Sequence, residues 1–188
     1  MSARGALVLV VGPSGAGKDT ILDGAGRRLA GDDRFVFARR EITRPAEAGG
    51  EDHAPVTWDQ FVERRADGVY GLHWEAHGLG YGVPATTLED INQGSAVIVN
   101  VSRGVIAGAR ERFPPVRVFS ITVPRAILEE RLRARGRETP EEIERRLARA
   151  DAYRVGGGDV VTVSNDGPVE RSIDSFVAQL MTVPLRSR

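Results

Sequence analysis

Short apolar runs alternate with segments of helical periodicity along the whole chain. The runs at 6–11 and 96–101 are almost continuously apolar, as in strands buried on both faces of a parallel sheet. Three further runs, at 34–40, 117–123 and 159–163, have the alternation or the apolar content of strands. The pattern therefore predicts five strands.

Helical periodicity fills most of the segments between these strands. Two helices begin with a capping box, formed by Thr57 and Gln60 in one and by Thr139 and Glu142 in the other. No element is predicted for residues 69–82, which are rich in glycine, histidine and aromatic residues without a clear period. The predicted helices cover 18–30, 57–62, 84–91, 105–113, 124–132, 139–150 and 169–181.

Strands that alternate with helices predict an α/β fold, with a parallel five-stranded sheet flanked by helices. In such sheets, ligands bind at the carboxyl ends of the strands. We therefore expect the segments that follow four of the strands to lie on one edge. These segments are 12–20, 39–44, 100–103 and 165–166.

The first of these segments has the pattern of a phosphate-binding loop between a strand and a helix. Glycines let its backbone curl, so that several N–H groups and the start of the helix point at one anion. Lys18 is the only lysine in the chain, and a compact ammonium fits inside such a loop where a guanidinium would not. The alternative is a glycine-rich turn without a ligand. The loop consists of Gly12, Pro13, Ser14, Gly15, Ala16, Gly17, Lys18, Asp19 and Thr20.

Asp19 departs from the usual loop, in which a serine or threonine after the lysine binds Mg²⁺. The carboxylate of Asp19 would suit Mg²⁺, directly or through water. Alternatively, Thr20 supplies the hydroxyl and Asp19 caps the helix. Both residues are therefore candidate metal ligands.

Arginines cluster on two helices that Gly136 is predicted to separate, and such a pair could close over ATP. Positive charge around a migrating phosphoryl group is what phosphoryl transfer needs. We expect two or three of these arginines to face phosphates and the others to pair with nearby glutamates on a solvated surface. The cluster comprises Arg131, Arg133, Arg135, Arg137, Arg145, Arg146 and Arg149.

A second anionic ligand is predicted beside Arg39, Arg40 and Arg44, which follow a predicted strand. Tyr81 and the histidines lie on loops expected to face this site, but the spacing of the histidines fits no usual metal motif. We expect Trp58 and Trp74 to be packing residues. The three histidines are His53, His73 and His77.

The composition is that of one ordinary domain of 188 residues, with 41% hydrophobic and 28% charged residues. Formal net charge is zero, which gives no reason to expect a nucleic-acid partner. The chain has no cysteine and no apolar run of membrane-spanning length. The first apolar run is expected to be a strand rather than a signal peptide. We therefore expect a cytoplasmic enzyme without a membrane or nucleic-acid partner, as a monomer or a homodimer.

Motifs over almost the whole chain resemble the guanylate kinase pattern, which implies a P-loop NTPase of the nucleoside-monophosphate-kinase type. That family has a core, here 1–38, 95–132 and 155–188, an acceptor-binding insert at about 39–94 and a lid at about 133–154. The resemblance implies that Lys18, Arg131, Arg135 and Arg146 surround the phosphates, that Asn165 lies near adenine, and that Arg44 and Tyr81 hold the acceptor's phosphate. It rests on the 12–18 loop, Thr43-Arg44-Pro45, Leu72-His73-Trp74, Tyr81-Gly82, Arg131-Leu132, Arg135-Gly136, Arg146-Leu147 and Asn165-Asp166.

Three departures argue against guanine as the acceptor's base. His73 stands where guanylate kinases have a glutamate, Glu47 where they have an arginine, and residues 100–103 where they have an aspartate-rich strand end. A pocket that loses carboxylates which bind guanine should reject it.

A narrower resemblance is to the ribose 1,5-bisphosphate phosphokinases. The family implies a transferase of phosphonate breakdown that uses ATP and Mg²⁺ to convert ribose 1,5-bisphosphate to 5-phosphoribosyl 1-diphosphate and ADP. A base-free acceptor with two phosphates fits the gain of Arg103, and we add Arg39, His73, Asn100 and Ser102 to its candidate ligands. The resemblance rests on Gly17-Lys18-Asp19, Glu41-Ile42-Thr43-Arg44, Glu51-Asp52-His53, residues 77–83, residues 99–103 and Gly136-Arg137-Glu138.

Three alternatives stay open. The chain could be a guanylate kinase, a kinase of another small metabolite such as a sugar acid, or a non-catalytic guanylate-kinase-like binding module. The last usually lacks the phosphate loop and the lid arginines, both of which this chain has.

Overall fold

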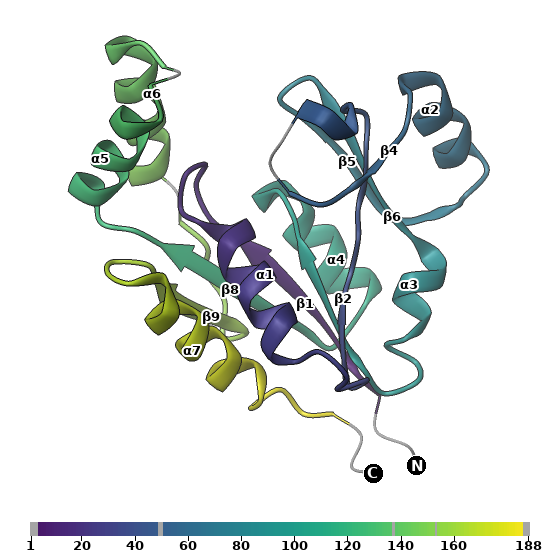
Figure 1. Cartoon of the computed structure of the whole chain (residues 1–188). Coiled ribbons are helices and arrows are strands. Elements are labelled where there is room, and N and C mark those ends of the chain that lie inside the picture. Colours follow the sequence, from purple (N-terminus) through teal and green to yellow (C-terminus); the bar gives the residue numbers. More distant parts are fainter. Residues whose placement is uncertain (1–3, 49–50, 137, 153, 186–188) are drawn as a thin grey trace. The chain divides into compact units, whose positions relative to one another are not determined.

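The computed structural model describes residues 4–48, 51–136, 138–152 and 154–185 and has an α/β fold with a five-stranded parallel sheet (Figure 1). The strand order is β2-β7-β1-β8-β9. The fold class and the five strands predicted for this sheet are confirmed. The strands are β1 (Ala6–Val11), β2 (Phe35–Phe37), β7 (Ala96–Asn100), β8 (Val116–Thr122) and β9 (Val160–Ser164).

The helices lie close to their predicted positions. Both capping boxes are confirmed, with Thr57 before α2 and Thr139 before α6. Gly136 ends α5 with a φ of 62°, which supports the predicted break between two helices. None of the described helices is both long enough and apolar enough to cross a membrane. They are α1 (Lys18–Arg28), α2 (Trp58–Ala66), α3 (Ala85–Glu89), α4 (Ile106–Arg112), α5 (Arg125–Arg135), α6 (Pro140–Asp151) and α7 (Val169–Leu180), with short 3₁₀ helices η1 (Ala46–Ala48) and η2 (Arg103–Val105).

A second, four-stranded sheet was absent from the predictions. Its order is β4-β3-β6-β5, with β3 (Glu41–Ile42), β4 (Ala54–Pro55), β5 (Tyr70–Ala76) and β6 (Leu79–Pro84). The predicted strand at 34–40 is too long, because β2 ends at Phe37 and the chain enters the second sheet at Glu41. The segment 69–82, for which no element was predicted, forms most of an antiparallel hairpin.

Glycines in this hairpin interrupt the alternation of apolar and polar residues by which a strand is predicted. Gly80 and Gly82 lie where a Cβ would fall 2.6 Å from the ring of Phe61 and 2.3 Å from the ring of Tyr70. The tight turn at His77 and Gly78 has positive φ at both residues, as hairpin turns require.

The two faces of the second sheet carry different residues. In the ladder, Trp74 pairs with Tyr81, while His73 pairs with Gly82, which also pairs with Glu41. Because successive side chains of a strand point to opposite faces, Trp74 and Tyr81 share one face and His73 and Glu41 share the other. We call these the Trp74 face and the His73 face.

The described residues fall into two compact units, drawn from the ranges Met1–Leu9, Gly31–Arg117 and Val183–Arg188 in one and Val10–Ala30 and Val118–Thr182 in the other. We call them the insert unit, which contains the second sheet, and the loop unit, which contains residues 12–20. In the loop unit, α5 and α6 pack side by side through Leu128, Leu132, Ile143 and Leu147 (Figure 1). The division into core, insert and lid stays a prediction.

Candidate functional site

The glycine loop of the loop unit leads from β1 into α1. Gly15 and Gly17 have φ values of 92° and 85°, which favour glycine, and Gly17 is the N-cap of α1. A Cβ at Gly15 would lie 2.9 Å from a methyl of Leu128. The loop therefore needs glycine both for its backbone conformation and for the close approach of α5.

Lys18 is the first residue of α1, and its side chain turns back over the loop. The ammonium Nζ donates hydrogen bonds to the carbonyl oxygens of Gly12 at 2.9 Å and Pro13 at 3.2 Å. The positive charge is thus held at the N-terminus of α1, where the helix dipole also favours an anion.

Asn165 supports the loop from the end of β9 and is 3% exposed. Its Nδ2 donates to the carbonyl of Ala16 at 2.8 Å, and its Oδ1 accepts from the hydroxyl of Ser172 at 3.1 Å. Both polar ends of the side chain are therefore used to position the loop. The predicted proximity of Asn165 to adenine stays a prediction.

Two of the predicted arginines contact this loop or its support. Arg146 of α6 donates to the hydroxyl of Ser14 at 2.9 Å and pairs with Glu138 at 3.2 Å. Arg131 of α5 donates to the carbonyl of Asn165 at 3.1 Å. Both residues therefore place a guanidinium beside the phosphate loop.

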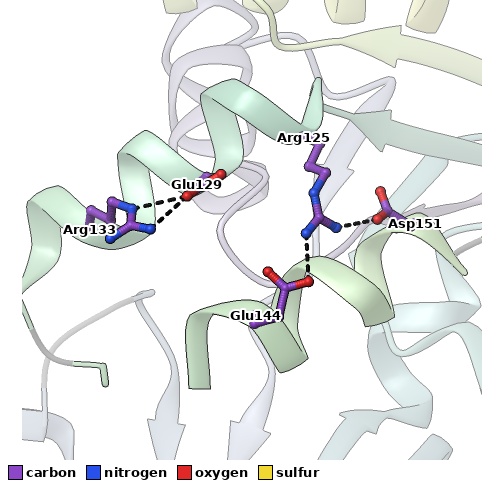
Figure 2. A network of polar contacts seen from close by, with 5 residues as sticks. All are labelled: Arg125, Glu129, Arg133, Glu144 and Asp151. Carbon is purple, nitrogen blue, oxygen red and sulfur yellow. Dashed lines mark hydrogen bonds and ion pairs between the residues drawn. The ribbon is translucent and has the colours of Figure 1, made fainter. Parts of the chain in front are cut away.

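Arg133 of the cluster, and Arg125, which also belongs to α5, have other partners. Arg133 pairs with Glu129, and Arg125 pairs with Glu144 and Asp151, on the exposed surface of α5 and α6 (Figure 2). The carboxylates of Glu144 and Asp151 raise the pKa of Arg125 above its ordinary value. The side chain of Arg135 is exposed, and Arg137 lies outside the described residues.

Asp19 and Thr20 lie in the first turn of α1. Asp19 is not the cap of this helix, because Gly17 occupies that position without a side-chain hydrogen bond. Among the described residues, no three His, Cys, Asp or Glu side chains are grouped so that they could hold a metal ion. The roles of Asp19 and Thr20 as metal ligands stay predictions.

A cavity of about 370 Å³ also lies within the loop unit. Pro13 of the glycine loop, Thr122 at the end of β8 and Leu147 of α6 line it. Arg125, Asp151 and Arg154 contribute its charged groups.

Arg44 of the insert unit is half-buried, and part of its guanidinium lacks protein partners. Its Nε and Nη2 are both buried without a hydrogen-bond acceptor. The loop that carries it is fixed by His53, which is 4% exposed and bonds the carbonyls of Arg44 at 2.9 Å and Glu51 at 3.0 Å. A guanidinium with two buried, unpaired donors is suited to an anionic ligand.

Arg39 and Arg40, adjacent in sequence, have opposite environments. Arg39 is exposed and pairs with Asp52 at 2.9 Å. Arg40 is 6% exposed, pairs with Glu51 and donates to the carbonyl of Asn100 at 2.8 Å. Arg40 therefore ties the end of β7 to the loop of Glu51.

Tyr81 lies on the Trp74 face together with Arg40. The Trp74 and Tyr81 rings are stacked, with centroids 5.2 Å apart, and the guanidinium carbon of Arg40 lies 5.2 Å from the Tyr81 centroid. The indole Nε1 of Trp74 is buried without a partner. Arg40 was expected beside an anionic ligand, but its burial and the stacking of Trp74 on Tyr81 depend on tertiary contacts that sequence patterns do not show.

His73 is not brought together with Tyr81, because strand alternation places it on the opposite face. That face also carries Glu41, whose carboxylate accepts from the Tyr70 hydroxyl at 2.6 Å and from Arg64 of α2 at 2.9 Å. The pKa of His73 is lowered below its ordinary value by desolvation and then by the charges of Arg65 and Arg112. The pKa of Tyr70 is raised by desolvation and by its hydrogen bond to Glu41.

The predicted residues after β7 lie in a short turn. Asn100 offers its carbonyl to Arg40, and Ser102 is the N-cap of η2 without a side-chain hydrogen bond. Arg103 begins η2 and is exposed. The structure therefore connects Asn100 to Arg40 on the Trp74 face.

The parallel sheet with a strand, a glycine loop and a helix that begins with Lys18 defines a P-loop kinase fold of the nucleoside-monophosphate-kinase type. Two solved structures have a similar fold, and at their low sequence identity this similarity shows the fold and not the function. Guanylate kinase from Anaplasma phagocytophilum has a TM-score of 0.64 at 23% identity, covering 96% of this chain and 86% of that one. A gluconokinase from Sinorhizobium meliloti 1021 has a TM-score of 0.51 at 17% identity, covering 96% and 95%.

The chain belongs to the ribose 1,5-bisphosphate phosphokinase family. It is 45% identical to ribose 1,5-bisphosphate phosphokinase PhnN of Brucella melitensis biotype 2, over 98% of this chain and 96% of that protein. It is 54% identical to PhnN of Acidiphilium cryptum over 81% of each chain. A bifunctional ribose 1,5-bisphosphokinase-thymidine phosphorylase of Azorhizobium caulinodans is 47% identical over 98% of this chain, which spans only 27% of that protein. No family model matches the sequence.

Proposed function

We propose that this protein transfers the γ-phosphoryl group of ATP to the 1-phosphate of ribose 1,5-bisphosphate, giving 5-phosphoribosyl 1-diphosphate and ADP. The observation that carries the proposal is the 45% identity to a ribose 1,5-bisphosphate phosphokinase over nearly the whole of both chains. The phosphate loop of Lys18 and the buried, unpaired donors of Arg44 give the two anionic substrates chemically suitable partners.

The loop unit would bind ATP. Lys18 and the loop amides fit a triphosphate, because the ammonium and the N-terminus of α1 already favour negative charge there. Arg131 and Arg146 would exchange their bonds to Asn165 and Ser14 for phosphate oxygens. The predicted phosphate role of Arg135 belongs to the same proposal.

Mg²⁺ would be held mainly by the nucleotide, with Asp19 or Thr20 as the protein's contribution. This fits the chemistry of Mg²⁺, which usually takes one or two protein oxygens together with phosphates and water. When bound, it neutralises charge on the β- and γ-oxygens.

The insert unit would bind the acceptor, with Arg44 and Tyr81 at a phosphate. A phosphate oxygen is already anionic at neutral pH, so the protein needs no general base to activate it. The contribution of the protein is therefore positioning and offsetting of charge. The acceptor-binding roles predicted for Arg39, His73, Asn100, Ser102 and Arg103 belong to the same proposal.

The family resemblance and the composition also suggest a biological setting. We propose a cytoplasmic enzyme of phosphonate degradation that supplies 5-phosphoribosyl 1-diphosphate, acts as a monomer or a homodimer, and has neither a nucleic-acid nor a membrane partner.

ADP release from ATP tests the proposal, with ribose 1,5-bisphosphate, GMP and gluconate as separate acceptors and Lys18→Met as the inactive control. We expect turnover with the bisphosphate alone. Turnover with GMP alone would indicate a guanylate kinase, and turnover with gluconate alone a sugar-acid kinase. ATP binding without any turnover would overturn the proposal, and a protein that does not bind ATP would favour the binding module.

A further inference from the structure

Trp74 lies in the middle of β5 and carries a buried hydrogen-bond donor that the protein does not use. Its indole Nε1 is buried and has no hydrogen-bond partner. A tryptophan N–H that is buried usually finds an acceptor, because leaving it unpaired forfeits its hydration. If Trp74 served only for packing, a phenylalanine would stack equally well without this unpaired group.

The ring of Trp74 is held in a fixed orientation. It stacks on Tyr81 with an interplanar angle of 1°, and the guanidinium carbon of Arg40 lies 5.9 Å from its centroid. Arg40 is itself held by Glu51 and by the carbonyl of Asn100. The direction of the indole N–H is therefore set by contacts within the insert unit.

The other unpaired buried groups of Arg40 and Arg44 are also donors. They are Nε of Arg40 and both Nε and Nη2 of Arg44. The Trp74 face and the loop that follows β3 thus combine unpaired donors with positive charge. The ligand that would satisfy such a set is rich in acceptor oxygens and carries negative charge, as a sugar phosphate does.

We propose that Trp74 is a substrate-binding residue, whose indole N–H donates a hydrogen bond to a phosphate oxygen of the ribose 1,5-bisphosphate acceptor, with Arg40 as the residue that positions the ring. This inference rests on the proposed function, since it names a further contact to the same acceptor. It assigns a polar role to a tryptophan for which the sequence predicts only packing.

The presence of only two tryptophans allows a direct test. Trp58 is 44% exposed on α2, and α2 contributes Arg64 to the contacts of the His73 face. Trp58→Phe therefore leaves Trp74 as the single emitter, whereas Trp74→Phe leaves Trp58. On saturation with ribose 1,5-bisphosphate, we expect the emission of Trp58→Phe to change, that of Trp74→Phe to stay constant, and ATP alone to leave both unchanged.

Steady-state kinetics separate binding from packing. Trp74→Phe keeps an aromatic ring against Tyr81 but lacks the N–H, so we expect the KM for ribose 1,5-bisphosphate to rise about tenfold while kcat and the KM for ATP stay within twofold. Trp58→Phe is the matched control and should change neither. A melting temperature close to that of the wild type would show that Trp74→Phe is folded.

The outcomes distinguish this inference from the proposed function. A wild-type protein without turnover on ribose 1,5-bisphosphate overturns the proposed function itself. If the wild type turns over, an unchanged KM in Trp74→Phe, or an emission of Trp58→Phe that does not respond to the bisphosphate, overturns the role of Trp74. The fluorescence result decides alone if Trp74→Phe fails to fold.

Discussion

The loop unit and the insert unit differ in how the hydrogen-bond donors of their candidate sites are satisfied. In the loop unit, Lys18 bonds the carbonyls of Gly12 and Pro13, and Arg146 bonds Ser14 and Glu138. In the insert unit, Arg44 and Trp74 keep buried donors without any protein acceptor. The first set is satisfied by the protein, and the second is not.

This difference separates two ways of preparing for an anion. Donors that bond protein oxygens must exchange those bonds for phosphate, so the loop unit gives up internal contacts when it binds. Unpaired buried donors lower stability by about 1–3 kcal/mol each, but they have no bond to exchange. We therefore expect substitutions of Lys18 and Arg146 in the loop unit to affect kcat, and substitutions of unpaired donors in the insert unit to weaken acceptor binding while sparing stability.

The largest effect is expected for Lys18→Met. Loss of the ammonium removes charge that stabilises the transferring phosphoryl group, and kcat should fall about 10³-fold. The kcat of Lys18→Arg should fall by a similar factor, because a planar guanidinium does not replace a compact ammonium in the loop. Single-turnover kinetics would measure the rates of both variants. A Lys18→Arg variant that keeps most of the activity would contradict the conclusion that the loop accepts only a compact ammonium.

Arg146→Ala should lower kcat about 10²-fold, since the guanidinium that bonds Ser14 is placed to move onto a phosphate. Arg133→Ala is the matched control, because Arg133 pairs only with Glu129 on the exposed surface among the described residues. Steady-state kinetics on both variants would decide whether loop contact selects the active arginines. Equal losses would contradict that conclusion.

Arg44→Met should raise the KM for the acceptor about 30-fold, because two hydrogen bonds to a charged group are lost. Its unfolding free energy should stay constant or rise by about 1 kcal/mol, since a guanidinium with two buried, unpaired donors is replaced by an apolar chain. Urea denaturation and steady-state kinetics measure the two effects. Arg28→Met, which removes an exposed ion pair with Asp174, is the control, whereas a comparable rise in the KM of Arg39→Met would support the role predicted for Arg39.

The phosphate loop could be predicted from sequence because its signals are local. Gly17 and Lys18 stand at fixed offsets between an apolar run and a helix, and both capping boxes follow a four-residue pattern. The five-stranded sheet followed from the alternation of elements for the same reason.

The second sheet and the composition of its faces could not be predicted in this way. Gly80 and Gly82 remove the apolar alternation from β6, because aromatic rings of other segments occupy the space above them. Without that register, nothing in the sequence separates the face of His73 from the face of Tyr81. The burial of Arg40 likewise cannot be predicted, because in the sequence it is one of several neighbouring arginines.

Surface arginines of the loop unit provide a baseline for the site arginines. Arg125→Ala breaks the pairs with Glu144 and Asp151, but all three side chains are largely exposed to solvent (Figure 2). Differential scanning calorimetry should show a fall in melting temperature of less than about 4 °C, with kcat unchanged. A larger loss of stability would mean that this surface network holds α5 and α6 together.

The smallest effect is expected at His73 and tests the assignment of the two faces. Desolvation and the guanidinium groups of Arg65 and Arg112 lower its pKa, and Glu75 only partly opposes them. The unfolded chain then binds a proton more readily, so stability is complete above the ordinary pKa near 6.5 and falls as the pH drops below it. In proton NMR titrations, the imidazole resonance of His73 is identified by its absence from His73→Gln. The midpoint of its titration should lie below pH 6.5. Arg65→Gln should raise that midpoint, whereas Arg133→Gln should not. A midpoint that responds to ribose 1,5-bisphosphate as strongly as to Arg65→Gln would instead show that the acceptor contacts His73.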